Sequence, residues 1–468
     1  MPSLKTDVDR LWDQAAIPAL EEYIRIPAIS PAYDAHWESQ GHLRQSLELA
    51  LEWFHAQNFP QAAGQILEAP GRTPLLILDI PPSHPQINGT TLLYGHMDKQ
   101  PPAQGWDENK GPWTPVMENN RLYGRGGGDD GYALFSALIA VKSLQLNQRP
   151  HGRCLILIET CEESGSFDLE HYLTAHQDLL PSPDLVICLD SDIWDWDRMW
   201  VTTSLRGLIE GELSVSLLDQ PIHSGNSGMV ASGFRVMRQL LDRIEDARTG
   251  ALHIDELNPP IPDQRTEQAQ QAAQVLARPI SADVPLLQDA QPVTQDPAEM
   301  ILNITWKPAL SYIASQGFPP PDNAANVLRP DTRFTLSFRS PPTADTGAAC
   351  RRLEQVLEAD PPHGAQTRFK VKGHSSGWEM PGFGNELDKR LREIAQECFG
   401  HAPCFKGQGG SIPFMTLLSR RFPLAKILII GVMGPSSNAH GPNEFLDIPY
   451  VKKLTLAVAK LLEKIPIN

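Results

Sequence analysis

Short apolar runs recur along the chain, and segments with helical spacing of apolar positions lie between them. Runs rich in Leu, Ile and Val are typical of buried strands. Such runs are Thr73–Ile80, Thr90–Tyr94, Cys154–Glu159, Leu185–Leu189 and Ile427–Val432. Helical spacing is found in Gly131–Leu144 and Asn385–Cys398. Strands that alternate with helices predict an α/β layered fold with a mixed, mostly parallel sheet.

The middle of the chain has a different pattern. Apolar and polar residues alternate in Leu208–Leu218 and Arg333–Phe338, as in strands with one buried face. Helical spacing accompanies them in Gly233–Ala247 and Thr346–Ala359. These elements predict a smaller α+β domain within the chain. The segment 255–297 is rich in Gln, Ala, Asp and Pro, which predicts a loosely ordered excursion of that domain.

Length and charge narrow the function. The 468 residues favour two domains. The net charge of −16 argues against nucleic acid or an anionic membrane as a partner, because both require a basic surface. The N-terminal segment MPSLKTDVDRLWDQAAIPALEEYIRI predicts an amphipathic helix and lacks the apolar core of a signal peptide. No run of 18 apolar residues occurs, so we expect no membrane span.

The six cysteines form no CxxC pair, and several lie in apolar segments. This pattern predicts free, buried thiols in a reducing compartment, and therefore a cytoplasmic protein. The cysteines are Cys154, Cys161, Cys188, Cys350, Cys398 and Cys404.

Candidate metal ligands come directly after the apolar runs or in glycine-rich turns. In an open α/β sheet, ligands bind at the carboxyl ends of the strands, so we expect these side chains to converge. Imidazole and carboxylate groups are ligands of zinc and similar ions, and a pair of ions needs a shared carboxylate. The candidates are His96 and Asp98, Asp129 and Asp130 in GRGGGDDG, Glu162 and Glu163, Asp190 and Asp192, and His440.

The adjacent glutamates Glu162 and Glu163 suit two roles, because one carboxylate can bind metal while the other handles a proton. Taken singly, each cluster has an ordinary structural explanation, such as a loop histidine, a solvated strand end or an Asp that caps a helix. The segment GRGGGDDG lacks the Lys-Ser/Thr of a P-loop and the spacing of a dinucleotide fingerprint. The clusters together, in this order, favour a metal centre.

The motifs GHMD, GRGGGDD, ETCEESGS, ICLDS, HSG, GGSIP and NAHGPNE, spread over roughly residues 19–451, resemble the M20 family of metallopeptidases, nearest its carnosinase-like dipeptidase branch. The resemblance implies a catalytic domain with a two-metal site, interrupted by a ferredoxin-like lid domain that also dimerises. We place the catalytic domain at residues 1–205 and 375–468 and the lid/dimerisation domain at 206–374.

The resemblance also implies a role for each candidate. His96 and Asp190 would bind the first ion, Glu163 and His440 the second, and Asp129 both. Asp98 would orient His96, and Glu162 would be the general base. His223 would reach the partner subunit's site and stabilise the oxyanion. Asn326, Arg339 and Ser411 would hold the substrate, where Arg339 suits a carboxylate because its guanidinium pairs both oxygens.

Two residues depart from the family pattern. Gln408 stands where related dipeptidases often have an acidic residue for the substrate's amino group, which Glu444 nearby is a candidate to replace. Gly131 stands in the place of a lysine, a change that we expect to alter only the surface of the turn.

The sequence therefore predicts a two-metal hydrolase for small peptides, a dipeptidase or short-peptide exopeptidase, with an N-acyl amino acid deacylase as the alternative that Gln408 favours. A non-catalytic protein on a retired hydrolase fold is a further alternative, which the complete ligand set disfavours. The expected cofactors are two divalent ions, Zn first, with Mn or Co acceptable. We expect a homodimer with a small peptide or N-acyl amino acid as substrate and without nucleic acid or membrane partners.

Overall fold

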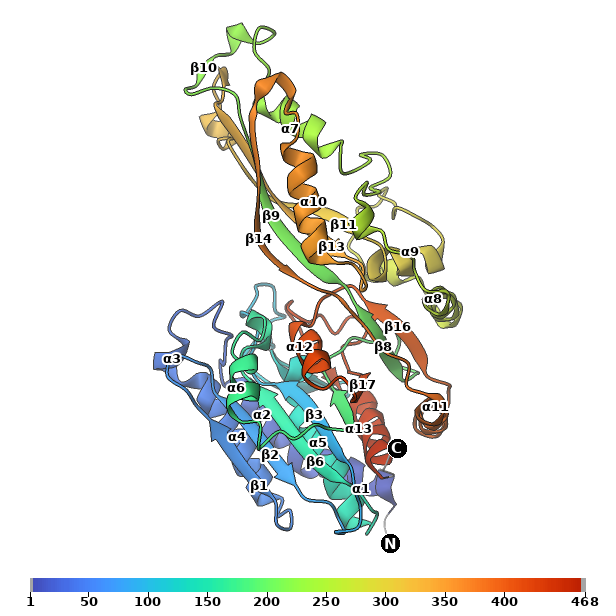
Figure 1. The fold of residues 1–468 in the computed structure, drawn as a ribbon. Coiled ribbons are helices and arrows are strands. Elements are labelled where there is room, and N and C mark those ends of the chain that lie inside the picture. The colour runs from blue at the N-terminus through green and yellow to red at the C-terminus, as the bar shows by residue number, and fades with distance from the viewer. Residues whose placement is uncertain (1–2, 464–468) are drawn as a thin grey trace. The chain divides into compact units, whose positions relative to one another are not determined.

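The computed structural model describes residues 3–463 (Figure 1), so residues 1–2 and 464–468 of the predicted ranges lie outside the described residues. The chain forms two compact units, which are described separately. Unit 1 comprises Met1–Thr202, Met380–Phe405 and Pro413–Asn468. Unit 2 comprises Thr203–Glu379 and Lys406–Ile412.

Unit 1 is built on a mixed sheet with a parallel centre. The strands β6, β3, β7 and β17 are adjacent and parallel, whereas β1, β2 and β8 pair in the antiparallel sense at the sides. Central strands are covered on both faces, which explains their continuous apolar sequences. In sheet order, the strands are β1 (Ala63–Leu67), β2 (Leu75–Ile80), β6 (Arg153–Glu159), β3 (Thr90–His96), β7 (Leu185–Cys188), β17 (Lys426–Ile429) and β8 (Trp200–Leu205).

Helices cover both faces of this sheet. Successive residues of a strand point to opposite faces. On β3, the Tyr94 ring stacks on Phe414 of α12 (Pro413–Arg421). The backbone at the next residue, Gly95, lies against Ala133 of α5 (Tyr132–Leu146), since an added Cβ would meet the Ala133 Cβ at 2.5 Å. The helix α5 is thus buried between the sheet and other helices, which explains why it has apolar residues on all of its faces.

The N-terminal segment is helical, as predicted, but a π-helical turn at Trp12–Ala16 divides it into two α-helices. The Trp12 indole donates a hydrogen bond to Thr455 of the C-terminal helix, which fixes the position of this turn. The other helices of unit 1 are α1 (Leu4–Leu11), α2 (Ile17–Arg25), α3 (Trp37–Gln40), α4 (His42–Ala56), α6 (Leu169–Ala175), α11 (Asn385–Phe399) and α13 (Ile448–Leu462). A small sheet adds β4 (Val116–Glu118), β5 (Arg121–Tyr123) and β18 (Phe445–Asp447).

Unit 2 is a ferredoxin-like α+β structure. Its antiparallel sheet has the order β11-β13-β9-β14, and two helices pack on one face (Figure 1). The alternating sequence of β9 matches this arrangement, because Ile209, Leu213 and Val215 enter the core. In chain order, the elements are β9 (Gly207–Ser216), α7 (Gly233–Leu241), β11 (Ala309–Gln316), β13 (Asp331–Ser340), α10 (Thr346–Glu358) and β14 (Gln366–Ser375). The predicted fold class is therefore confirmed, an α/β unit interrupted by a smaller α+β unit.

The prediction of a loosely ordered segment at 255–297 was wrong in part. Residues Asp263–Val275 form the helix α8, because Gln and Ala favour helices and Ala269 and Ala272 provide a buried contact surface. The helix α7 ends at Leu241, earlier than predicted. The remaining elements are β10 (Ile222–His223), α9 (Pro297–Thr305), β12 (Val327–Leu328), β15 (Trp378–Glu379) and β16 (Cys404–Gln408).

Each of the six cysteines is a free thiol, and all but Cys398 are buried. Among the described residues, no helix has the length and apolar character needed to cross a bilayer.

Candidate metal centre

Three neighbouring strands of unit 1 end at the candidate site. The parallel strands β6, β3 and β7 lie side by side, and their registers pair His96 with Glu159 and Tyr94 with Cys188. Their carboxyl ends are therefore level with one another. His96 is the last residue of β3, Glu162 and Glu163 lie in the turn after β6, and Asp190 follows β7 by two residues.

Two further side chains reach the same edge of the sheet from loops. Asp129 lies in the turn Gly127–Gly131 that leads into α5, and His440 lies in the loop between β17 and β18. The structure gathers these side chains into two groups, whose ligand atoms lie within 4.8 Å of one another in each group. The groups are His96, Asp129 and Asp190, and Asp129, Glu163 and His440.

Asp129 belongs to both groups, and its two oxygens face different histidines. Oδ1 lies 3.4 Å from Nε2 of His96, and Oδ2 lies 3.1 Å from Nε2 of His440. The His440 Nε2 is also 3.4 Å from Oε2 of Glu163. A carboxylate placed in this way can bind two cations at once.

A buried hydrogen-bond network supports these ligands. Asp98 Oδ1 lies 3.3 Å from Nδ1 of His96, and the two carboxylate oxygens of Asp98 accept hydrogen bonds from the backbone N–H groups of Glu162 and Glu163. Ser30 Oγ donates to Asp98 at 2.6 Å, and Gln100 Nε2 donates to Glu163 Oε2 at 2.6 Å. Sequence reasoning missed Ser30 and Gln100, although Gln100 lies only two residues after the end of the GHMD motif.

The donor set fits divalent cations. The Nε2 atom of His96 is buried and makes no hydrogen bond of acceptable geometry to any residue in 3–463, as expected for an atom that binds a metal. Burial, together with neighbouring carboxylates, raises the pKa of Glu163 to about 8 and that of Asp190 to about 6. Burial also raises the pKa of Glu162 well above its usual value. Nearby positive charge would favour the ionised form of each of these carboxyl groups.

Asp190 and Asp192 have different surroundings. Asp190 belongs to the His96 group. The carboxylate of Asp192 accepts a hydrogen bond from the indole N–H of Trp194 at 3.2 Å, and its backbone pairs with Met433.

The candidate substrate residues all lie in unit 2, in two places. His223 and Asn326 are both exposed, on β10 and directly before β12, and Ser224 N–H donates to the Asn326 carbonyl. Figure 1 shows β10 at one end of unit 2 and β16, which ends at Gln408, at the other. Unit 2 thus does not bring His223 together with Gln408.

Two arginines of unit 2, Arg206 and Arg339, lie close enough to repel each other. Burial, and then repulsion from Arg339, lowers the pKa of Arg206 to about 10. The Arg206 backbone N–H donates to the Gln408 carbonyl and its side chain donates to the Gly409 carbonyl, so it holds the turn that leads to Ser411.

Two expectations at the site were wrong. Glu444 is not available for a substrate ammonium group, because it is fully buried and its carboxylate pairs with Arg125 at 2.5 Å. Gly131 does not lie on the surface of its turn. It is buried, and an added Cβ would meet the Tyr23 ring at 2.2 Å, so a lysine does not fit there.

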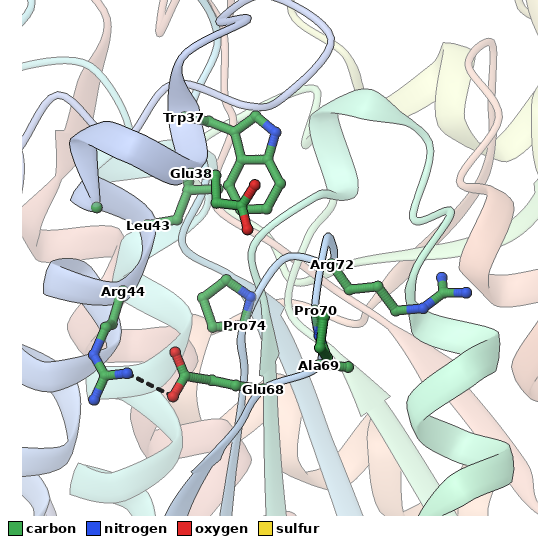
Figure 2. Close-up of a pocket in the computed structure, with 10 residues that line it drawn as sticks. Trp37, Glu38, Leu43, Arg44, Glu68, Ala69, Pro70, Arg72 and Pro74 are labelled. Carbon is green, nitrogen blue, oxygen red and sulfur yellow. Dashed lines mark hydrogen bonds and ion pairs between the residues drawn. The ribbon is translucent and has the colours of Figure 1, made fainter.

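A separate surface pocket in unit 1 has a different character (Figure 2). Its volume is about 370 Å³. Arg44 pairs with Glu68, and Arg72 pairs with Asp168. Its arginines already have carboxylate partners, so this pocket has fewer charged groups available for a bound ligand than the metal centre has. Its lining residues are Trp37, Glu38, Gly41, Leu43, Arg44, Glu68, Ala69, Pro70, Arg72 and Pro74.

An α/β unit whose strand ends present two histidine–carboxylate groups with a shared aspartate has the site of a metal-dependent hydrolase. The sequence model of peptidase family M20/M25/M40 matches residues 92–464, and the chain therefore belongs to this family.

Individual relatives agree with this assignment. The chain is 26% identical over 390 residues to cysteinylglycine-S-conjugate dipeptidase of Corynebacterium striatum, which covers 80% of each chain. It is 27% identical to the Beta-Ala-His dipeptidase of Mus musculus, over 63% of this chain and 59% of that enzyme. The structure of human carnosine dipeptidase 1 superposes with a TM-score of 0.75 at 19% identity over 99% of both chains, which shows a shared fold.

Proposed function

We propose that this protein is a two-metal dipeptidase or short-peptide exopeptidase. The observation that carries the proposal is the pair of ligand groups that share Asp129, with the carboxylate of Glu162 beside them, 4.0 Å from His96 Nε2. The named dipeptidases among the relatives support peptide substrates. Zinc is the proposed metal because it accepts imidazole and carboxylate ligands, and manganese or cobalt accepts the same set.

In the proposed assignment, one ion would be held by His96, Asp190 and Asp129, and the other by Asp129, Glu163 and His440. When bound, the two ions supply Lewis acidity that polarises the substrate carbonyl and makes a water molecule more acidic. Asp98 orients His96 through its Nδ1. Glu162 takes the proton from the attacking water and passes it to the leaving nitrogen.

We further propose that residues 206–374 act as a lid/dimerisation domain and supply the substrate contacts. Arg339 pairs with the substrate carboxylate and Asn326 holds a substrate carbonyl. Outside that range, Gln408 and Ser411 in the returning segment Lys406–Ile412 of unit 2 contact the rest of the substrate. His223 stabilises the oxyanion, a contribution of about 3 kcal/mol for a single donor. The separation of His223 from Gln408 within unit 2 supports a contribution of His223 to the partner subunit's site.

The homodimer is part of this proposal, and the surface of unit 2 supports it. The aromatic patch consists of Phe234, Tyr312, Phe318 and Phe334, whose rings contact one another in a chain at 5.6–6.0 Å between centroids. Three of them are exposed, Phe318 by 54%. Tyr312 lies on β11, the edge strand of the sheet. Exposed apolar patches and open sheet edges mark surfaces that bind a partner.

The free thiols of the six cysteines support a reducing compartment, and we propose the cytoplasm.

Gln408 supports an N-acyl amino acid deacylase as the second candidate, because an amide lacks the charge that attracts a substrate ammonium group. A panel of dipeptides with free and acylated amino ends distinguishes the two functions. The panel is run on protein reconstituted separately with Zn and with Mn. In each case we expect a higher kcat/KM for dipeptides with a free amino end than for acylated ones. Hydrolysis of acylated substrates alone would establish the deacylase, and no hydrolysis of either would contradict both proposals.

A further inference from the structure

A buried ion pair lies beside the candidate metal centre. The side chains of Arg125 and Glu444 are 1% and 0% exposed, and Arg125 Nη1 lies 2.5 Å from Glu444 Oε2. The second oxygen of Glu444 accepts a hydrogen bond from the Gly126 N–H at 2.9 Å and a longer one from the Asp129 N–H at 3.4 Å. The Glu444 carboxylate is therefore bound to the backbone of the residue that both ligand groups share.

The same pair also reaches the loop that carries His440. Arg125 Nη2 donates to the carbonyl of Gly441, the residue after His440, at 2.9 Å. The pair thus connects the turn of Asp129 with the loop of His440, which are more than 300 residues apart in the chain.

The His440 loop has little other regular support. Its residues Ser436, Asn438, His440 and Asn443 all have positive φ values, between 57° and 64°, so its backbone is in neither a helix nor a strand. The ladder between β18 and β5 ends at Phe445 opposite Tyr123, and one further bond joins Gly124 N–H to the Glu444 carbonyl. Arg125 and Glu444 therefore lie where regular pairing ends and the two ligand segments begin.

The other ligands are held independently. His96 lies at the end of β3 in the centre of the sheet, and Asp190 follows the adjacent strand β7. Among residues 3–463, no hydrogen bond or ion pair joins His96 or Asp190 directly to Arg125 or Glu444. Loss of the pair should thus affect the two ligand groups unequally.

We propose that the Arg125–Glu444 pair is a positioning device for the ion held by Asp129, Glu163 and His440. The inference rests on the proposed two-metal function. Residues that orient metal ligands from outside typically contribute about 10- to 100-fold in metal affinity. Removing the charge of Glu444 therefore weakens binding of this ion by at least tenfold. The other ion is weakened less, because it shares only Asp129 with the segments that the pair holds.

The test is calorimetric titration of the metal-free full-length chain with Zn²⁺ and with Mn²⁺. Wild type is compared with Glu444→Gln, which has nearly the same size without the charge. Because that variant leaves a buried arginine without its partner, the double variant Arg125→Met/Glu444→Gln removes both charges and decides the question if the single variant does not fold. Circular dichroism establishes folding of each variant.

Asp79→Asn is the matched control. It breaks the Asp79–Arg153 ion pair of unit 1, and Arg153 begins β6, at the opposite end of that strand from the candidate site. We expect this variant to bind two ions as wild type does.

The expected result is two ions in wild type and in the control, and selective weakening of one ion in the variants. Unchanged affinity for both ions in a folded variant would overturn the inference, as would equal weakening of both. Fewer than two ions in wild type would overturn the proposed two-metal function instead, and the positioning role with it.

Discussion

Two adjacent glutamates at the site have different partners, and this difference separates their proposed roles. The carboxylate of Glu163 is held by Gln100 at 2.6 Å and lies 3.4 Å from His440 Nε2. The Glu162 carboxylate points to the other side, toward His96. Asp98 accepts a hydrogen bond from the backbone N–H of each, which fixes the turn between them. This difference supports the proposed roles of Glu163 as a ligand and Glu162 as the general base.

Glu162→Gln tests this difference. The amide cannot accept a proton, so we expect kcat to fall by about 10²–10⁴-fold, the usual contribution of general acid–base catalysis. Both ions should stay bound, because Glu162 is outside the two ligand groups. Steady-state kinetics together with metal analysis of the dialysed protein measure both quantities.

Glu163→Gln is the comparison variant, and we expect it to lose an ion. Nearly normal kcat in Glu162→Gln, or loss of an ion from it, would show that the base has been assigned wrongly.

At the residue scale, the sequence predicts which side chains are candidate ligands, but it does not predict all of the residues that hold those ligands in position. His96, Asp129, Glu163, Asp190 and His440 could be named because each follows a strand or lies in a recognisable motif. The contacts of Gln100, Arg125 and Glu444 could not be predicted, because they depend on how loops distant in the chain pack. For this reason Glu444 could be considered a candidate for the substrate's amino group, although its carboxylate pairs with Arg125.

At the scale of elements, the site depends on close packing at the ends of the central strands. Gly431 comes two residues after β17 and lies against the segment that follows β7. An added Cβ would be 1.9 Å from the backbone oxygen of Ser191 and 2.4 Å from its nitrogen. Only a residue without a side chain allows β17 and the Asp190 segment to approach so closely.

Gly431→Ala should therefore displace the Asp190 segment. We expect the free energy of unfolding to fall by about 1–3 kcal/mol, a typical cost of overpacking, and the affinity for one ion to fall with it. Denaturant unfolding and metal titration measure these effects. Gly382→Ala is the control, since its Cβ would meet no atom within 4 Å. Wild-type stability of Gly431→Ala would contradict the argument.

The strands were predicted well because they are continuous apolar runs in a parallel sheet. The helix α8 was missed because its sequence is polar, and helices of that kind gain their stability from a few tertiary contacts rather than from an apolar stripe. The π-helical turn at Trp12–Ala16 was also missed, because it depends on a contact with Thr455 that local sequence does not indicate.

At the scale of the whole molecule, the aromatic patch of unit 2 predicts a homodimer. Phe234→Asp places a charge in the patch, and we expect multi-angle light scattering to show half the wild-type mass. If His223 acts in the partner subunit's site, kcat should fall as the dimer dissociates. Phe167→Asp is the control, because Phe167 is also exposed, by 54% against 40% for Phe234, but lies in unit 1. A monomeric wild type, or a dimeric Phe234→Asp, would contradict the prediction.

The two-unit organisation was visible in the sequence because the pattern changes from continuous apolar runs to alternation and back again. The sequence does not indicate how the subunits of the proposed homodimer would meet, since neither composition nor periodicity shows which surfaces are in contact.

The return of the chain to unit 1 has a consequence for biosynthesis. The strand β17 lies between β7 and β8 in the sheet, and His440 follows it, yet both are translated after the whole of unit 2. A nascent chain that ends before residue 426 leaves β7 and β8 unjoined and lacks one imidazole. Contacts between such distant segments form late. We therefore expect the sheet of unit 1 to be completed, and the second cation to be bound, only when synthesis is nearly finished. Until then, chaperones would encounter an incomplete unit 1 together with a unit 2 that is able to fold earlier.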